Sequence, residues 1–367
     1  MENEQTSFRI YDEQISGDSP GSESSYGRNV LRKTGLVAAM GAALAFTIII
    51  ALIAANPSVP LVDLLRELVT FDTRSTVGWR VWRIYMPIIV AAIITGAGLA
   101  LSGTVMQCIL RNPLASPYTL GLSSASAFGA AFAILFLDSG SATSAYISIS
   151  SPYVTTACAF GFAMLATGMI LLLTRFTRVS AETMVLAGIA ISAMFSAGLT
   201  LMQYMADSVQ LSAIVSWSFG SLTQANWRWD VLVLLVFLPI TLYFILARWD
   251  LNAIDAGDEV AKGLGVNTER FRIVGLVLSA LLSAVLVSGF GVIAFVGLMA
   301  PHLARMVTGS DHRFLIPMSA ATGALVLLTA NTVAMNVLRP MVLPVGLLTS
   351  LLGGPMFIYL LVRRYRR

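Results

Sequence analysis

The chain has 367 residues, of which 57% are hydrophobic and only 11% are charged. Soluble globular domains carry roughly 25% charged residues, so this composition excludes a soluble enzyme and indicates a polytopic membrane protein. The formal net charge of +4 does not indicate a nucleic-acid partner, because the basic residues are divided among short segments between apolar runs and form no soluble basic face.

The chain begins with a polar segment, residues 1–33, in which acidic residues are mixed with Ser and Gly. Such a segment cannot bury enough apolar area to fold alone, so we predict a disordered cytoplasmic N-terminal tail followed by one transmembrane domain, residues 34–367. The first apolar run, residues 34–55, exceeds the 7–15 residues usual for a signal peptide and follows an acidic tail. We therefore expect it to remain as a span.

Continuous apolar runs follow along the rest of the chain. A membrane-spanning helix needs about 20 mostly apolar residues, whereas barrel strands would alternate over about 10 residues. The runs therefore predict an all-α fold with about ten transmembrane helices. The eighth run is short and contains Pro301, which makes it the candidate for a half-span. The predicted spans are residues 34–55, 84–106, 119–137, 153–174, 184–205, 231–248, 271–290, 292–306, 314–336 and 345–362.

Lysine and arginine set the orientation of such a chain, because cytoplasmic loops carry an excess of both. With the N-terminus inside, most of the 23 basic residues fall in segments that would be cytoplasmic, including the basic C-terminal tail. The bias fits an even number of spans, so both termini are predicted to be cytoplasmic.

Two polar segments interrupt the apolar pattern. The second span is rich in small residues between Gly96 and Gly103 and ends in residues 111–117, where Pro113 and Pro117 break the helix. We expect dense helix packing followed by a structured cytoplasmic loop. Residues 250–272 form the most hydrophilic internal segment.

Within this hydrophilic segment, residues 256–265 predict a short helix that is closed by glycine. Asp258 and Lys262 are four residues apart, a spacing that supports an isolated helix. Val260, Ala261 and Leu264 are predicted to form one small apolar face, which needs a partner to cover it.

The sequence disfavours a disulfide, a metal site, ion coupling and ATP hydrolysis by this chain. Cys108 and Cys158 fall at opposite ends of the membrane in the predicted topology, and no metal-ligand spacing is present. His302 and His312 are interpreted as structural or contact residues rather than metal ligands. Ionisable residues are nearly absent from span interiors, which argues against ion coupling. No G-x-x-x-x-G-K-S/T phosphate loop is present, so any ATP hydrolysis must come from another polypeptide.

Four segments, in order, carry a family pattern. They are residues 98–107 with 111–115, Trp217 with 220–222, residues 259–261 with 264–265, and residues 291–313 followed by 344–346 and 353–357. Together they resemble the FecCD-type permeases, the membrane subunits of ABC importers for cobalamin, siderophore-iron, haem and related chelates. The stretch from Phe295 to Arg313 is the most specific part of the resemblance.

The resemblance implies a type II ABC importer permease fold of about ten helices in a prokaryotic plasma membrane. It implies a dimer with one translocation path, a homodimer rather than a heterodimer, surrounded by membrane lipid. Two copies of a cytoplasmic ATP-binding subunit would bind below, with ATP and Mg on that partner, and an extracytoplasmic substrate-binding protein would dock above. The chain itself would bind no cofactor or metal and would not be an enzyme.

The resemblance also implies roles for particular residues. A coupling helix at about residues 255–265 would enter a groove of the ATPase, and residues 190–203 and 346–354 would line the path. The residues implied in ATPase coupling are Ala256, Gly257, Asp258, Glu259, Ala261, Leu264, Gly265, Arg305, Asp311, His312 and Arg313. Those implied at the cytoplasmic gate are Asn112, Leu114, Ser180, Ala181 and Glu182.

The outer side departs from the family pattern. Residues 85–88 read Tyr-Met-Pro-Ile where the family often has Arg-Leu/Ile-Pro-Arg, and the charged positions of residues 330–335 and 342–344 are replaced by uncharged ones. Either the charged pairs were removed together, or the subunit uses other arginines or pairs with a different permease. The candidates for docking the binding protein are Arg80, Arg83, Arg228 and Arg339.

We therefore predict the membrane-spanning permease subunit of an ATP-driven importer of iron chelates or cobalamin-type substrates, working by alternating access. The alternatives are an ion-coupled secondary transporter of a similar substrate and a membrane scaffold or receptor without transport.

Overall fold

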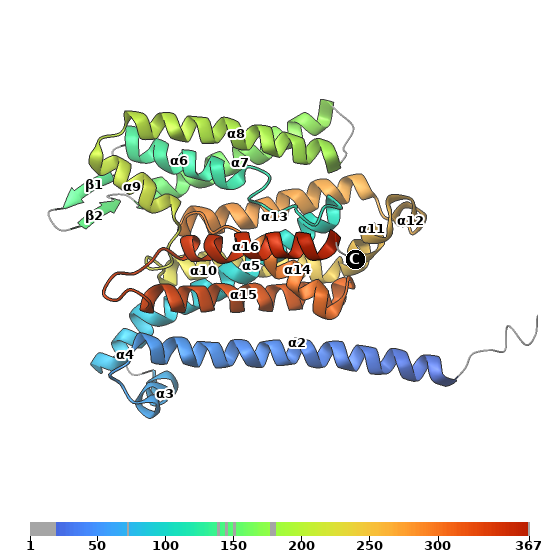
Figure 1. Cartoon of the computed structure of the whole chain (residues 1–367), viewed down its shortest axis with the longest axis horizontal. Helices are drawn as coiled ribbons and strands as arrows, with labels where there is room; N and C mark the ends of the chain where they lie inside the picture. The colour runs from blue at the N-terminus through green and yellow to red at the C-terminus, as the bar shows by residue number, and fades with distance from the viewer. Residues whose placement is uncertain are drawn as a thin grey trace, which may run out of the picture.

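The structure, a computed structural model, describes residues 20–71, 73–137, 140–143, 146–149, 152–176 and 181–365. It is a bundle of helices whose long axes run roughly side by side (Figure 1). One end of the bundle carries α11, α12 and the C-terminus, and we call it the α12 end. The opposite end carries α3, α4, α9 and the strands, and we call it the α3 end.

The helices are, in chain order, α2 (Pro20–Ala55), α3 (Leu61–Thr70), α4 (Thr76–Arg80), the π-helical segment η1 (Val81–Tyr85), α5 (Met86–Ile109), α6 (Leu122–Phe136), α7 (Pro152–Phe176), α8 (Ala181–Met205), α9 (Ser208–Ser218), α10 (Trp227–Leu246), α11 (Arg248–Ala256), α12 (Asp258–Gly263), α13 (Thr268–Phe290), α14 (Val296–Thr308), α15 (His312–Asn336) and α16 (Val345–Tyr365). Strands β1 (Gly140–Thr143) and β2 (Tyr146–Ile149) pair antiparallel, with Gly140 opposite Ile149.

The predicted all-α membrane fold is confirmed. Seven helical segments are long and apolar enough to cross a membrane, namely α2, the run from α4 through η1 to α5, α7, α8, α10, α13 and α15. Shorter apolar helices lie at α6 and α16, and α14 has 13 residues. Each of the predicted spans coincides with one of these helices. The β1–β2 hairpin and helices α3, α4 and α9 were not predicted.

The predicted disordered tail was wrong in its C-terminal part. Helix α2 begins at Pro20 and continues without interruption to Ala55. Adding residues to an existing helix costs far less than nucleating a new one, so the apolar span extends into the polar residues before it. Residues 1–19 of the predicted tail lie outside the described residues.

Helix α5 is the centre of the bundle, and almost all of its residues are buried. It packs against α10, α13, α14 and α15. A Cβ added to Gly103 would lie 1.7 Å from the carbonyl oxygen of Gly297, and one added to Gly96 would lie 2.3 Å from that of Gly323. Only glycine permits these two backbones to approach α5, so the expected dense packing of the small-residue stripe is confirmed.

Helix α14 is the predicted half-span, but Pro301 is not the reason. Pro301 lies inside the helix. The interruption is the non-helical segment 291–295, where Gly291 and Phe295 have φ angles of 75° and 65°. Ile293 and Ala294 are buried in this segment. Irregular backbone at membrane depth is tolerated when it is enclosed by protein, as here.

The expectation that span interiors nearly lack ionisable residues has an exception. Asp230 lies in the first turn of α10 and is 2% exposed. Neither of its carboxylate oxygens has a hydrogen-bond partner among the described residues. The predicted sixth span began one residue later, so Asp230 was placed outside it.

Candidate coupling site

The polar centre of the α12 end is built where helix α5 stops. Arg111 follows the helix with a φ of 45°, a left-handed conformation that turns the chain sharply. From this position its Nη2 donates to the Ile254 carbonyl oxygen at 3.1 Å. Two residues earlier, the Ile109 carbonyl oxygen accepts a 3.0 Å hydrogen bond from Nε of Arg272. The end of α5 is therefore tied to both α11 and α13.

Asp258 lies between the two arginines. Its Oδ1 is 2.8 Å from Nη2 of Arg111 and 2.9 Å from Nη2 of Arg272, and its Oδ2 accepts from the same Arg272 nitrogen at 3.0 Å. We call these three side chains the Asp258 clamp. It joins α12 to the ends of α5 and α13.

The clamp is favoured by its surroundings. Arg272 is buried, with only 7% of the residue exposed, so its charge needs a partner. Asp258 is in the first turn of α12, where a carboxylate also interacts favourably with the helix dipole. The preceding Gly257 has a φ of 137° and separates α11 from α12.

The predicted coupling helix is therefore shorter than residues 255–265. Asp255 and Ala256 belong to α11, the break is at Gly257, and α12 covers residues Asp258–Gly263. Leu264 and Gly265 follow it as a turn, and Gly265 has a φ of 84°.

The predicted single apolar face of α12 was wrong. Ala261 is completely buried, whereas Val260 and Leu264 are 50% and 70% exposed. Val260 and Leu264 are four residues apart and lie on the outward side, together with the exposed Glu259 and Lys262. The outward surface of α12 is thus two apolar side chains flanked by one acid and one base, while Asp258 points inward to the clamp.

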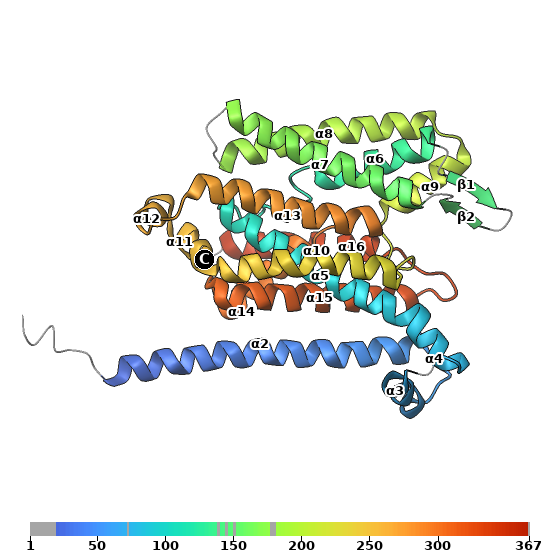
Figure 2. The same ribbon diagram turned by 180° about the vertical axis from the view of Figure 1, so that it is seen from behind.

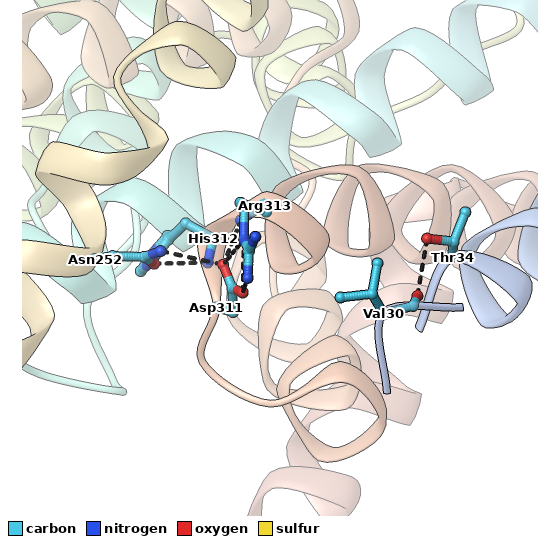
Figure 3. A network of polar contacts seen from close by, with 6 residues as sticks. All are labelled: Val30, Thr34, Asn252, Asp311, His312 and Arg313. Atoms are coloured by element: carbon cyan, nitrogen blue, oxygen red, sulfur yellow. Dashed lines mark hydrogen bonds and ion pairs between the residues drawn. The ribbon is translucent and has the colours of Figure 1, made fainter. Parts of the chain in front are cut away.

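A second polar cluster ties α11 to the start of α15 (Figure 3). Asn252 donates from Nδ2 to Oδ1 of Asp311 at 3.1 Å. Its own Oδ1 accepts from the backbone N–H of His312 at 2.8 Å and lies 2.9 Å from Nδ1 of the same residue. His312 is fully buried, and its implied role in ATPase coupling stays a prediction.

Asp311 is the N-cap of α15, and its carboxylate accepts the backbone N–H of Arg313 at 3.0 Å. It also pairs with the Arg313 guanidinium at 2.7 Å. Burial acts to raise the pKa of Asp311, but the hydrogen bonds from Arg313 and Asn252 outweigh it and lower this pKa to about 2. The carboxylate is therefore ionised at neutral pH.

Arg305 and Arg313 both contact α11 or its flanks. Nη1 of Arg305 is 3.6 Å from Oδ2 of Asp255 and donates to Ser310 Oγ at 3.3 Å. The guanidinium of Arg313 lies over the Trp249 ring, 4.9 Å from its centroid. The turn between α14 and α15 is thus fixed to the same short helix that precedes the clamp.

The structure brings only part of the predicted gate together with this site. The Asn112 side-chain oxygen accepts the backbone N–H of Leu114 at 2.9 Å, which shapes the loop immediately after Arg111. Leu114 is exposed. Ser180 lies outside the described residues, and for Ala181 and Glu182 only the backbone, at the start of α8, is described. Their predicted role at a gate stays a prediction.

The four candidate docking arginines are all exposed. Arg80 and Arg83 belong to α4 and η1, Arg228 to the first turn of α10, and Arg339 to the segment between α15 and α16. Arg339 donates to the Ala54 carbonyl oxygen. Nearby, Trp227 donates from Nε1 to the Trp82 carbonyl oxygen at 2.7 Å and ties α10 to η1.

Sequence reasoning missed the partners that hold the predicted residues in place. Arg272 and Asn252 were assigned no role, and Arg111 was noted only as part of a loop and of a family motif. A signal was available for Arg272, because it is the last charged residue before the apolar run of its helix, and an arginine at the edge of a membrane span often has a specific partner. Nothing in the pattern of α11 pointed to Asn252.

The bundle of apolar helices, its interrupted spans and the polar site at one end define a polytopic membrane protein. The sequence model of the FecCD transport family matches residues 43–363. The chain belongs to this family, which confirms the resemblance found in its motifs.

Several proteins that are named as transport permeases or solved as ABC transporters align with most of the chain. MJ0087 of Methanocaldococcus jannaschii, named as an ABC transporter permease protein, is 50% identical over 78% of this chain and 82% of its own length. The hemin transport system permease protein of Yersinia pestis is 39% identical over 78% of this chain and 84% of its own. A solved inward-facing structure assigned to the metal-chelate type of ABC transporter has a TM-score of 0.77 and 31% identity, covering 90% of this chain and 99% of that one.

Proposed function

We propose that this chain is the permease subunit of an ATP-driven importer for iron chelates, such as siderophore-iron or haem, or for cobalamin-type substrates. Membership of the FecCD transport family supports the transport role. The substrate class is supported by the hemin permease of Yersinia pestis and by a vitamin B12 import permease of Vibrio cholerae, which is 34% identical over 78% of this chain.

In the proposed assembly the α12 end faces the cytoplasm, with both termini on that side of a prokaryotic plasma membrane. Two copies of the chain form a homodimer around one path, and each copy binds one cytoplasmic ATP-binding subunit, which holds ATP and Mg. The exposed Val260 and Leu264 support this arrangement, because an apolar pair on a short polar helix is poorly suited to water. An extracytoplasmic substrate-binding protein docks at the α3 end, where Arg80, Arg83 and Arg339 are exposed.

The observation that carries the mechanism is the Asp258 clamp. A partner that displaces α12 pulls on Arg111 and Arg272 through one carboxylate. Arg111 is covalently continuous with the loop of Asn112 and Leu114, so the displacement reaches the proposed gate without an intervening flexible linker. The chain performs no chemistry of its own in this scheme; it converts closure of the ATPase into alternating access.

An ion-coupled secondary transporter is the second candidate, and Asp230 is the observation in its favour. Buried carboxylates within membrane helices are common parts of proton and cation pathways. Asp230 lies in one span and has no hydrogen-bond partner among the described residues. No second buried acid accompanies it among the described residues, and this favours the ATP-driven scheme.

The test is uptake by proteoliposomes that contain the chain, its cognate ATPase and the binding protein. Haem, cobalamin and ferric siderophores are offered outside, with ATP enclosed. We expect uptake of one class that requires ATP and is lost when the ATPase lacks its phosphate-loop lysine. Leu264→Asp should abolish ATPase capture, whereas Glu259→Gln, which changes charge on the same exposed surface, should weaken it far less. Uptake driven by an ion gradient without the ATPase would overturn the proposal.

A further inference from the structure

A pocket of about 470 Å³ opens at the α3 end among α7, α9, α10 and α13. In Figure 2 these helices lie on the face toward the viewer, and α13 packs between α7 and α10. The pocket takes its walls from the first turns of α7 and α10 and the last turns of α9 and α13. The polar residues that line it are Thr155, Thr156, Ser216, Ser221, Thr223, Gln224, Asn226 and Arg228.

The charge of the pocket is positive. Arg228 is the one Lys, Arg, Asp or Glu side chain among the described lining residues. Nε1 of Trp229, which also lines the pocket, is buried without a hydrogen-bond partner among the described residues. A guanidinium surrounded by hydroxyl and amide groups is suited to a phosphate, which accepts several hydrogen bonds at once.

The surroundings of the pocket are apolar on the side toward the middle of the bundle. Leu232 lines its edge, and the exposed Leu235 and Leu238 continue along the same helix. Tyr153, Trp217 and Trp229 also line the pocket. Tyrosine and tryptophan gather where membrane meets water. The pocket therefore changes from cationic and polar to apolar along the membrane normal.

We propose that this pocket binds one anionic phospholipid, with its phosphate at Arg228 and an acyl chain along Leu232 and Leu235 of α10. A phospholipid matches both ends of the pocket, whereas an acidic side chain of a binding protein would match only the cationic end. Two of the helices that form the site, α7 and α10, have outward surfaces that are largely apolar and exposed, as for a lipid-facing side. The proposal rests on the proposed function only for the leaflet, which is the outer one.

The experiment measures lipid retention. The chain is reconstituted into nanodiscs of phosphatidylglycerol and phosphatidylcholine, extracted into mild detergent, and weighed by native mass spectrometry. We expect one retained phosphatidylglycerol per chain. Arg228→Gln and Leu232→Trp, which fills the apolar edge, should each reduce its occupancy at least about tenfold. Arg83→Gln is the matched control, because Arg83 is exposed at the same end and does not line the pocket.

Three outcomes overturn the proposal. Equal retention by the wild type and both pocket variants would show that this pocket is not the lipid site. If glycerol phosphate displaces the lipid at a concentration no higher than the one at which the lipid itself binds, the acyl chain contributes nothing. The site then binds phosphate alone. Loss of binding-protein capture in Arg228→Gln, with unchanged lipid retention, would assign the pocket to protein docking. ATP-driven uptake is measured in parallel, and its persistence keeps the proposed function separate from this result.

Discussion

Removal of the Asp258 carboxylate tests whether the clamp holds α12 to the bundle. Asp258→Asn keeps the size of the side chain and removes the charge that lies between Arg111 and Arg272. The Arg272 side chain is 9% exposed and would lose its carboxylate partner, whereas the Arg111 side chain is 38% exposed and can turn to water. We therefore expect most of the loss to come from the Arg272 contact.

The magnitude follows from this difference in exposure. A hydrogen bond to a charged group contributes roughly 1.5–3 kcal/mol, and we assign about 2 kcal/mol to the Arg272 contact. A solvent-exposed ion pair contributes roughly 0–1 kcal/mol, and we assign about 0.5 kcal/mol to the Arg111 contact. The sum, about 2–3 kcal/mol, corresponds to a roughly 30- to 150-fold larger population of detached α12.

Hydrogen–deuterium exchange of the chain in detergent or nanodiscs measures that population. Amides of Ala261, Leu264 and Val266 donate to the carbonyl oxygens of Gly257, Val260 and Ala261, and they exchange only when this segment opens. Their exchange should accelerate by the factor given above in Asp258→Asn.

The matched control is Glu259→Gln, which removes the same charge from the next residue, where the side chain is exposed. A double-mutant cycle with Arg272→Gln should give a coupling free energy of about 1–2 kcal/mol. If Asp258→Asn and Glu259→Gln exchange within about twofold of each other, the clamp does not hold α12 and the proposed transmission through it fails.

Three further substitutions test other parts of the structure. The pKa of Asp311 is lowered to about 2, so the carboxylate contributes its full stabilisation of the folded state above about pH 4 and loses it as the pH falls through 2. Asp311→Asn should lower Tm by roughly 2–6 °C at pH 7. A Tm difference between wild type and variant that does not shrink between pH 4 and pH 2 would contradict this. Gly103→Ala places a methyl group on the Gly297 carbonyl oxygen and should lower Tm strongly, whereas Gly168→Ala, with open space around it, should leave Tm unchanged or slightly raised; equal thermal shifts would argue against the close approach of α5 and α14. Asp230→Asn removes a buried carboxyl group that has no hydrogen-bond partner among the described residues and should raise Tm by a few degrees at neutral pH. A lower Tm would instead indicate that the carboxyl group has a bound cation or another stabilising partner.

The positions of the spans could be predicted because hydrophobicity in a membrane chain is a local property. Each run of about 20 apolar residues forms its own helix, and no distant contact is needed to decide it. The predicted limits of α2 and of the proposed coupling helix were wrong because they do not depend on local hydrophobicity. Extension of α2 to Pro20 depends on a helix already formed, and the break before α12 depends on the conformation of Gly257.

The contents of the candidate site depend on contacts between segments far apart in the sequence. Asp258 and Lys262 have a spacing that suggests a local pair, and the sequence alone offered no reason to prefer another. In the fold, Asp258 is within 2.9 Å of Arg111 and Arg272, which precede and follow it by many residues. Leaving the buried Arg272 without a carboxylate costs more free energy than leaving the exposed Lys262 without one. The pair of Asp258 with Arg272 is therefore favoured over the local pair with Lys262.

Helix α11 determines how α12 can move. The Ile254 carbonyl oxygen, near its C-terminus, accepts a hydrogen bond from Arg111 of the clamp. Its Asn252 forms hydrogen bonds with Asp311 and His312 at the start of α15. Asp255 on the same helix lies beside Arg305 of α14. A force on α12 is therefore resisted by α5, α13, α14 and α15 together, all of which pack into the core. Since none of these attachments passes through a long loop, α12 has little freedom to move alone, and its displacement should tilt these helices as a group rather than bend one of them.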